Sequence, residues 1–335
     1  MIWRCMLLGC LLLTSTHLLS YPVHAATMIK VALVTPEGST WTKILYQMAD
    51  EVERKTGGEI TFKIYAGGIN GDELDVLRKM HVYRIHAAGF SGVGLGVILP
   101  EIRILEAPLM FQNYAEVDYV KDKLSDRLSA GFEKKGFVLL GFAEAGFVYF
   151  FSKSPMDTIG GVGAAKMWAW KGDPVAETFL KSFGIKTYPL HLTDVNTGLE
   201  TGMIDSFYAP PLAAVAFQWY AKVDSMLDYP MVNSTGALLM KKSIFNRLSP
   251  ANQAILRDAG EKYCDELIRL SRRDNEEARV VLKEEEIQFT QPSADLTVFF
   301  RKRAQKTYLK NIPKLYSREL FDQVQSHLNE YRNRK

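Results

Sequence analysis

The feature of this sequence that most restricts its fold is a long stretch without proline near the C-terminal end. Ser249-Pro250 predicts the start of a helix, because serine caps free N–H groups and proline is favoured at the first helical position. From Ala251 to about Glu286 the chain contains no proline and only one glycine, Gly260. Helices of this length are uncommon in globular proteins. We therefore predict one long helix that shapes the architecture of the whole chain.

The predicted helix carries a charged segment in its middle. Its apolar face is formed by Ile255, Ala259, Tyr263, Leu267 and Leu270. The charged segment 272–277 interrupts this face. A polar centre predicts a helix that bridges two bodies with its middle in solvent. Two shorter helices with a break between them remain the alternative.

The first residues have the organisation of a cleaved secretory signal peptide. Arg4 gives a short basic start, an apolar run covers residues 5–13, and the small residues Ala25-Ala26 close the segment. The apolar run is too short to span a bilayer. Residues 7–10 resemble a lipoprotein cleavage box, but apolar sequence continues after them, which disfavours lipidation. We expect cleavage after Ala25 and a mature chain in the periplasm.

The composition of the remaining chain excludes several classes of protein. Of the three cysteines only Cys264 follows Ala25, so the mature chain forms no internal disulfide. No later window is long and apolar enough to span a membrane. The net charge of +3 comes without the clustered basic residues that nucleic-acid binding needs, so we expect no nucleic-acid partner.

Strand and helix patterns alternate along the rest of the chain. Apolar residues between Trp41 and Val52 recur at helical spacing, Asp72 can cap a second helix, and a third fits 194–201. The predicted strands cover residues 29–34, 59–65, 137–151, 166–170, 185–190 and 203–207. This alternation predicts an open α/β sheet covered by helices. Because no long linker is present, we expect two halves that pack closely and exchange strands.

Motifs that would indicate catalysis are absent. The segment Gly89-Phe90-Ser91-Gly92 approaches a nucleophile elbow, but Val93 stands where that motif needs glycine. The glycines of 92–96 have the wrong spacing for a dinucleotide loop, and the six histidines are scattered without ligand spacing. We therefore expect no enzyme, no metal site and no cofactor. A secreted enzyme remains the alternative from another class.

Three stretches together resemble a known family. They are Lys55–Ile60 with Ala66–Gly68, Leu99–Ile102 with Ala107–Phe111, and Thr193–Leu199 with Gly202, Asp205 and Pro210. In this order and spacing the chain resembles the solute-receptor subunits of tripartite ATP-independent periplasmic (TRAP) transporters, of the dicarboxylate-receptor (DctP) type. The resemblance covers about residues 28–330.

The resemblance implies an α/β, two-domain periplasmic binding-protein fold with hinge strands and one long helix spanning both domains. The implied division is a signal peptide at 1–25, domain I at 28–145 plus 234–273, and domain II at 146–233 plus 274–330. It also implies a small organic solute bound in the interdomain cleft, hinge closure, and delivery to TRAP membrane subunits. A ligand-exchange role beside a helical-repeat periplasmic protein is kept as an alternative.

The sequence departs from the family where its members usually hold carboxylates with arginine. One such arginine follows a Gly-Phe pair, and here Gly146-Phe147 is followed by Val148. The second lies twenty residues further on, at the position of Trp168. An arginine fork makes two parallel charge-assisted hydrogen bonds to a carboxylate, which neither valine nor an indole can replace. We therefore expect a ligand that is neutral, apolar or aromatic rather than a C4-dicarboxylate.

The residues expected to bind this ligand come from both domains. From domain II they are Val148, Trp168, Trp170, Phe207, Tyr208 and Ala209, and from domain I they are Trp41, Phe90 and Ser91. The aromatic residues among them could instead form interdomain core. Ser91 could donate a hydrogen bond to the ligand or solvate its glycine-rich loop. Another basic residue, such as Lys171, could restore carboxylate binding.

Overall fold

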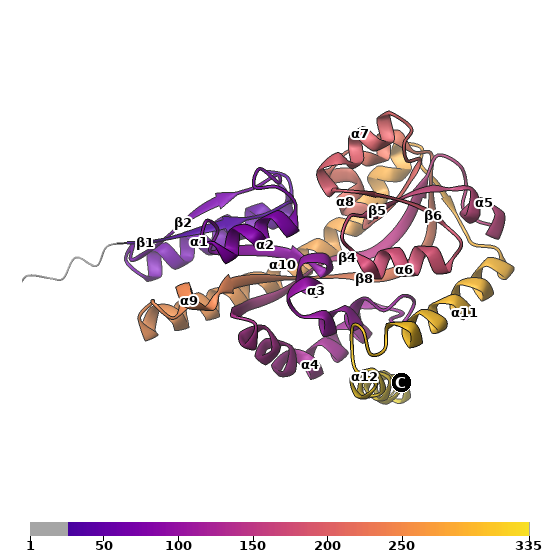
Figure 1. The fold of residues 1–335 in the computed structure, drawn as a ribbon. Coiled ribbons are helices and arrows are strands. Elements are labelled where there is room, and N and C mark those ends of the chain that lie inside the picture. The colour runs from indigo at the N-terminus through magenta and orange to yellow at the C-terminus, as the bar shows by residue number, and fades with distance from the viewer. Residues whose placement is uncertain (1–25, 335) are drawn as a thin grey trace, which may run out of the picture.

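The structure, a computed structural model, describes residues 26–334, so the expected signal peptide lies outside the described residues. It has the expected α/β architecture, built on one nine-stranded sheet with the order β2-β1-β3-β8-β4-β7-β5-β6, to which β9 (Gln288–Thr290) adds by pairing with β8. Figure 1 shows that the sheet and its helices form two lobes. No helix in the described part of the chain is long and apolar enough to cross a membrane.

The first lobe is built on three parallel strands. β1 (Thr27–Ala32) lies between β2 (Ile60–Tyr65) and β3 (Ala87–Ser91), and its helices are α1 (Thr40–Lys55) and α2 (Glu73–His81). Helix α1 buries the face predicted from its spacing, including Ile44, Met48 and Val52. Asp72 caps α2 as expected, with Asp75 completing a capping box. The local signals of this lobe therefore agree with its fold.

The second lobe is built on β5 (Lys166–Trp170), β6 (Lys186–Leu190) and β7 (Ser206–Ala209), which run parallel to one another. Around them lie α5 (Ile159–Ala164), α6 (Pro174–Ser182), α7 (Val195–Glu200) and α8 (Pro211–Ala216), with short 3₁₀ turns at Leu192–Asp194 and Trp219–Lys222. The strand expected at 203–207 is shifted toward the C-terminus. Asp205 uses its side chain to accept from the backbone N–H of Lys166, and the ladder begins at Ser206.

Two long antiparallel strands run through both lobes, as expected for a chain that exchanges strands. β4 (Phe137–Ser152) pairs with β8 (Ser225–Lys241) from Phe137 opposite Lys241 to Ser152 opposite Ser225. β8 also pairs with β3 of the first lobe, and β4 pairs with β7 of the second. Three register irregularities interrupt the β4–β8 ladder, one of them between Glu144 and Gly146 where the lobes meet. Bulges bend and twist a strand, so this ladder is suited to act as a hinge.

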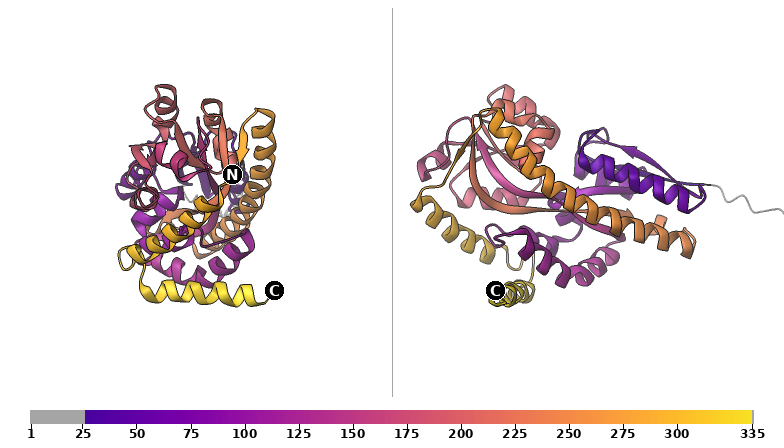
Figure 2. Two further views of the ribbon diagram at one scale, coloured as in Figure 1. Left: turned by 90° about the vertical axis from the view of Figure 1, so that its right-hand side faces the viewer. Right: turned by 180° about the vertical axis from the view of Figure 1, so that it is seen from behind.

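The long helix is confirmed as one helix, α10 (Pro250–Glu284), which excludes the two-helix alternative. Ser249 caps it by accepting from the backbone N–H of Asn252. Figure 2 shows α10 crossing diagonally behind both lobes, where it packs on α1, β4 and α8. The expectation of a solvated middle holds for one face of the helix, where Arg273, Glu276 and Glu277 are exposed, and fails for the other face. Arg272 pairs with Asp118 and Glu144, because the polar segment faces charged partners on α4 and β4.

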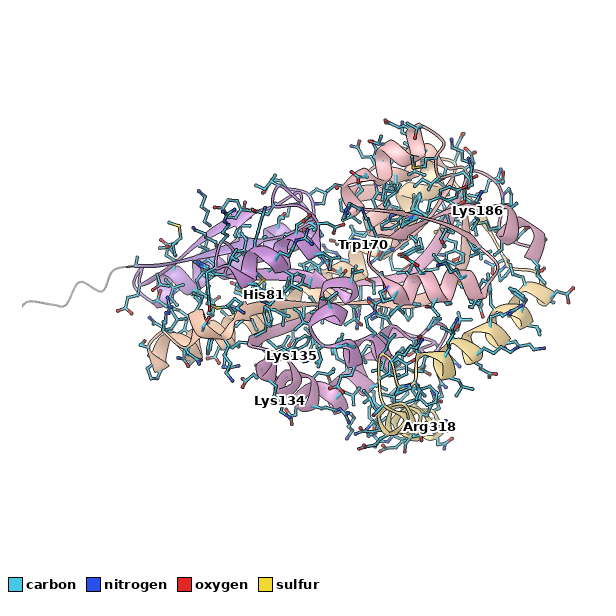
Figure 3. All side chains as sticks on the ribbon, in the orientation of Figure 1. His81, Lys134, Lys135, Trp170, Lys186 and Arg318 are labelled. Atoms are coloured by element: carbon cyan, nitrogen blue, oxygen red, sulfur yellow. The ribbon has the colours of Figure 1, made fainter. Side chains whose placement is uncertain are left out.

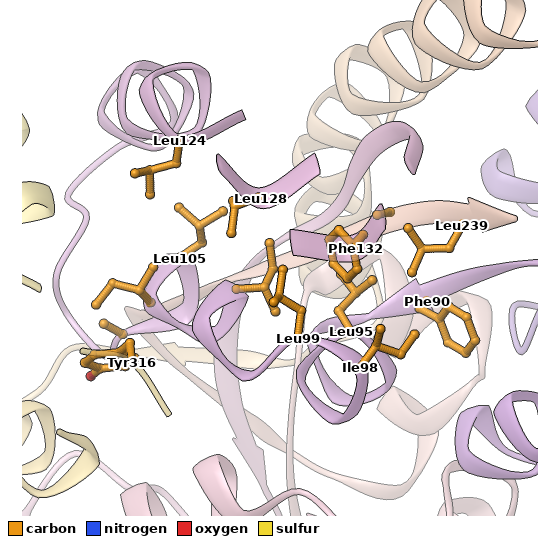
Figure 4. Close-up of a cluster of buried hydrophobic side chains, with 14 of the residues drawn as sticks. Phe90, Leu95, Ile98, Leu99, Leu105, Leu124, Leu128, Phe132, Leu239 and Tyr316 are labelled. Carbon is orange, nitrogen blue, oxygen red and sulfur yellow. The ribbon is translucent and has the colours of Figure 1, made fainter. Parts of the chain in front are cut away.

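The remaining elements connect the strands already described or follow α10 at the C-terminal end. The glycine-rich segment 89–96 ends β3 and begins α3 (Gly92–Ile98). After α3 come a 3₁₀ helix (Pro100–Glu106), α4 (Tyr114–Lys134) and then β4. A short α9 (Lys242–Phe245) follows β8. α11 (Ala294–Asn311) packs near α6, and α12 (Arg318–Asn333) packs on α4. Figure 4 shows part of the largest core cluster, to which Leu95 of α3, Leu105 of the 3₁₀ helix, and Leu124 and Phe132 of α4 belong.

Candidate ligand-binding cleft

A cavity of about 180 Å³ lies between the two lobes, far more space than one water needs. Eight of the nine residues expected to bind ligand line it: Trp41, Phe90, Ser91, Val148, Trp168, Trp170, Tyr208 and Ala209. Seven of them lie on β3, β4, β5 and β7 and Trp41 lies on α1, so residues of both lobes meet at one space. Figure 3 marks Trp170 at the junction of the lobes.

Phe207 is the expected residue that does not line the cavity. It is fully buried and stacks on Phe151, with ring centroids 4.8 Å apart. Successive side chains of a strand point to opposite sides of a sheet, so Phe207 and Tyr208 on β7 point in opposite directions. The alternation within β7 therefore assigns Phe207 to the core behind the cavity and Tyr208 to its wall.

The wall of the second lobe is a continuous aromatic surface. Trp168 stacks on Tyr208 with ring centroids 5.0 Å apart, and Trp219 meets Trp168 edge-on at 5.4 Å. The indole N–H of Trp168 donates to the carbonyl oxygen of Leu190 at 3.0 Å. Because this donor is already used within the protein, Trp168 offers the cavity an apolar face and no hydrogen bond.

A carboxylate organises the turn between β3 and α3. Glu73 accepts hydrogen bonds from the backbone N–H groups of Ser91 and Gly94 at 2.7 and 2.8 Å, and the Ser91 hydroxyl donates to it at 3.0 Å. Burial raises the pKa of Glu73 to about 7, against the lowering effect of these N–H donors. The Ser91 hydroxyl is therefore engaged with Glu73, and its oxygen also caps α3.

A buried charge cluster, which the sequence analysis did not anticipate, forms another part of the lining. Arg103 Nη2 lies 3.0 Å from Asp173 Oδ2, and its Nε lies 3.0 Å from Glu106 Oε2. Although burial opposes the charge, Asp173 and Glu106 raise the pKa of Arg103 above its usual value. Burial raises the pKa of Glu106 to about 7, which Arg103 partly counteracts. Arg103 thus joins the first lobe to the second inside the cleft.

Both carboxylates of this cluster also hold backbone in place. Asp173 caps α6 by accepting from the N–H groups of Val175 and Ala176 at 2.9 and 3.3 Å. Glu106 accepts from the N–H of Thr235 on β8 at 2.9 Å. Asp173 before Pro174 is a recognisable helix start, but nothing in the local sequence shows that this cap meets Arg103, 70 residues away.

The cluster supplies the cation nearest to a ligand. Among the cavity-lining residues that the structure describes, Arg103 is the sole lysine or arginine. Lys171, considered as a replacement for the family arginines, is exposed and does not line the cavity. The described residues contain no group of histidine, cysteine and acidic side chains placed to hold a metal ion.

This two-lobed frame with an interlobe cavity is matched by known proteins. The profile of the family described as "Bacterial extracellular solute-binding protein, family 7" (DctP) matches residues 31–314, most of the chain. The chain belongs to this family. A solute-binding protein of Verminephrobacter eiseniae is 28% identical over 242 residues, which are 71% of each chain.

Solved structures of the family share the fold. The sugar acid binding protein DctPAm of Advenella mimigardefordensis, in complex with galactonate, has a TM-score of 0.85 at 19% identity and covers 91% of this chain and 98% of its own. A TRAP periplasmic solute-binding protein of Xanthobacter autotrophicus with bound β-D-galacturonate has a TM-score of 0.83 at 20% identity, covering 90% of this chain and 99% of its own. The expected two-domain fold is confirmed.

Family membership defines the role of the DctP-type chain. It is an extracytoplasmic solute-binding protein, that is, a receptor for a small solute and not an enzyme. The periplasmic location follows from the family. The residue boundaries given for its two domains remain a prediction, and so do the roles of its cavity residues.

Proposed function

We propose that this TRAP receptor binds a solute whose body is apolar or aromatic, and that it does not bind C4-dicarboxylates. One observation carries the proposal: Val148 and Trp168, at the two positions where relatives are expected to present arginine, line the cavity together with Tyr208. The ligand-facing surfaces of these residues are aliphatic and aromatic. Burying a carboxylate against them without a paired cation would cost several kcal/mol.

The competing proposal is a carboxylate receptor that uses another basic residue. Relatives with bound galactonate and galacturonate give this alternative weight. Arg103 would be the cation, but its guanidinium already faces Asp173 and Glu106 at 3.0 Å each. An incoming carboxylate would have to displace one of these anions or add a third negative charge to the cluster. This arrangement favours the apolar ligand.

The test is a thermal-shift screen of the mature chain, residues 26–335. The panel pairs succinate, malate, galacturonate and galactonate with neutral aromatic and long-chain apolar solutes. A ligand that binds only the folded state raises the melting temperature. We expect shifts from apolar or aromatic members only. Strong, salt-sensitive shifts from succinate or malate would contradict the proposal and assign the carboxylate to Arg103.

Hinge closure over the ligand follows from the same proposal. β4, β8 and α10 connect the lobes, and ligand contacts with both lobes would favour the closed form. The helical-repeat partner remains a prediction, because no feature of the described residues favours it over direct delivery to the membrane subunits.

A further inference from the structure

We propose that the solute carried by this receptor bears a protonated amine, seated between the acidic groups of the cavity and its aromatic wall. The inference rests on the proposed function and refines it, because it assigns a sign of charge to the polar part of an otherwise apolar ligand. It follows from three features of the cavity: its charge balance, its hydrogen-bonding capacity and its aromatic faces.

The charge balance of the lining is negative. Glu73, Glu106 and Asp173 contribute three carboxylates, and Arg103 contributes one guanidinium. All four side chains are at least nine-tenths buried, so solvent screens their charges weakly. An anionic ligand would increase this imbalance, whereas a cationic ligand would reduce it. The field of the cavity therefore favours a positive ligand group.

The lining also keeps unused capacity to accept hydrogen bonds. Glu106 accepts one hydrogen bond, from the backbone N–H of Thr235, and forms one ion pair, with Arg103. Its two carboxylate oxygens could together accept about four hydrogen bonds, so part of this capacity is unused. The Thr35 hydroxyl lines the cavity, is buried and has no hydrogen-bond partner. Thr235, 4% exposed, also lines the cavity, and its hydroxyl makes no hydrogen bond within residues 26–334. An ammonium group brings three donors and no acceptor, which complements this surface.

The aromatic wall lies next to the acidic groups. The backbone N–H of Asp173 donates to the carbonyl oxygen of Trp170 at 3.0 Å, so the end of β5 and the cap of α6 are one unit. Tyr208, stacked on Trp168, is near enough to Asp173 for that carboxylate to contribute to its raised pKa, although burial is the larger cause. Aromatic faces attract cations, and they also cover the apolar body of a ligand.

The sign of the ligand's charge is tested with three carbon skeletons, each used as an amine, an alcohol and a carboxylate. The probes are hexylamine, hexanol and hexanoate, the phenylethyl series 2-phenylethylamine, 2-phenylethanol and phenylacetate, and the indole series tryptamine, tryptophol and indole-3-acetate. Their effect on the melting temperature of residues 26–335 is measured at pH 8, where the carboxylates of the cavity are largely ionised. In at least one series we expect the amine to give the largest shift and the carboxylate none.

The outcomes separate this inference from the proposed function. If the alcohols match or exceed the amines, the amine inference is overturned while the proposal of a ligand with an apolar or aromatic body survives. If the carboxylates give the largest shifts, both are overturned. If no amine shifts the melting temperature, the inference is overturned, and the wider panel decides the proposed function by itself.

A charge-removing variant tests whether the acidic groups act on the ligand. Asp173→Asn removes one negative charge, and the asparagine side chain can cap α6 as well as aspartate does. Because it also weakens the ion pair with Arg103 that joins the lobes, it should weaken the binding of every ligand, and we expect amine binding to fall about tenfold further than alcohol binding. Glu266→Gln, on the exposed face of α10, is the matched control and is expected to change neither. Equal weakening of amine and alcohol by Asp173→Asn would reduce the cluster to a structural role and overturn the inference.

Discussion

The indole Nε1 of Trp170 donates a hydrogen bond of 2.9 Å to Oδ2 of Asp72, on the opposite lobe. Asp72 caps α2 in the first lobe, and the same oxygen accepts from the backbone N–H of Leu192 at 3.1 Å in the second lobe. His191 Nδ1 lies 3.2 Å from this oxygen as well. One buried carboxylate therefore holds both lobes together beside the cavity, without any contribution from a ligand.

The first prediction follows from this contact. Trp170→Phe keeps an aromatic ring in the cavity wall but removes the N–H that reaches Asp72. A buried hydrogen bond to a charged group contributes about 1.5–3 kcal/mol, so the closed form should lose at least about tenfold in population relative to the open form. We expect weaker ligand binding in calorimetry and a larger radius of gyration in X-ray scattering.

Trp168→Phe is the matched control, because its lost indole hydrogen bond, to Leu190, lies within the second lobe. It should leave the radius of gyration unchanged. If both variants expand the protein equally, the expansion reflects general loosening of the aromatic wall and the Asp72 contact does not control closure.

Local sequence signals anticipated the elements better than the contacts between them. The Ser249 cap, the proline at position 250 and the absence of later breakers correctly predicted α10, because helix termini and breakers act within a few residues. The charged segment of that helix is solvated on one face only, which the sequence did not show. Arg272 is 21% exposed and meets Asp118, 154 residues away, a pairing that no local pattern encodes.

The candidate site shows the same division. Residues at the ends of predicted strands, such as Trp168 and Tyr208, could be placed near the cleft because a sheet brings strand ends together. Phe207 was misplaced, since the predicted strand did not show which face each side chain takes. The Arg103 cluster could not be foreseen, because it joins a 3₁₀ helix to the cap of α6 only after the lobes meet.

The second prediction concerns the hinge at Gly146. This residue has φ +104°, and a Cβ there would lie 2.4 Å from Nδ2 of Asn275 on α10. Asn275 donates to the carbonyl oxygen of Ala145 at 2.7 Å and accepts from the backbone N–H of Leu212 at 2.9 Å, so it connects the hinge to α8. Gly146→Ala should lower the stability by about 2–4 kcal/mol, measured by urea unfolding.

Gly163→Ala provides the control for the loss of glycine as such. Gly163 lies in α5, and no heavy atom would be within 4 Å of an added Cβ. Alanine there should leave the stability unchanged or raise it slightly, because it favours the helix. Equal effects of the two substitutions would show that the hinge has no special requirement for glycine at 146.

The third prediction concerns Cys264, the one cysteine among the described residues, which is 4% exposed on α10. Burial raises the pKa of its thiol to about 12, and only the thiolate reacts rapidly. The folded mature chain should therefore not react with a chromogenic disulfide reagent that reports free thiols. After denaturation, one equivalent of thiol per chain should react. Rapid labelling under native conditions would show that α10 separates from β4 far more often than this packing suggests.

The last prediction is a dependence of stability on pH that arises from Glu106. Its pKa is raised from 4.5 to about 7 by burial, and the groups facing it are Arg103, Asp173 and Tyr208 together with the backbone N–H of Thr235. Between these two pH values the folded chain binds more protons at this site than the unfolded chain does. The stabilisation is therefore full below about pH 4.5 and is lost as pH rises through 7.

The contribution of Glu106 is isolated by comparison with Glu106→Gln, which cannot titrate. Relative to this variant, the free energy of unfolding of the wild type should fall by about 3 kcal/mol between pH 5 and pH 8, measured by urea unfolding. The control is Glu266, a carboxylate whose pKa is instead lowered by Arg269. The variant Glu266→Gln should therefore show the same dependence of unfolding free energy on pH as the wild type throughout this window. A constant difference between wild type and Glu106→Gln would mean that Arg103 keeps Glu106 ionised at every pH tested. The cavity would then keep the negative charge of Glu106 even in mildly acidic solution, and Glu106 would contribute no pH dependence to amine binding over the same range.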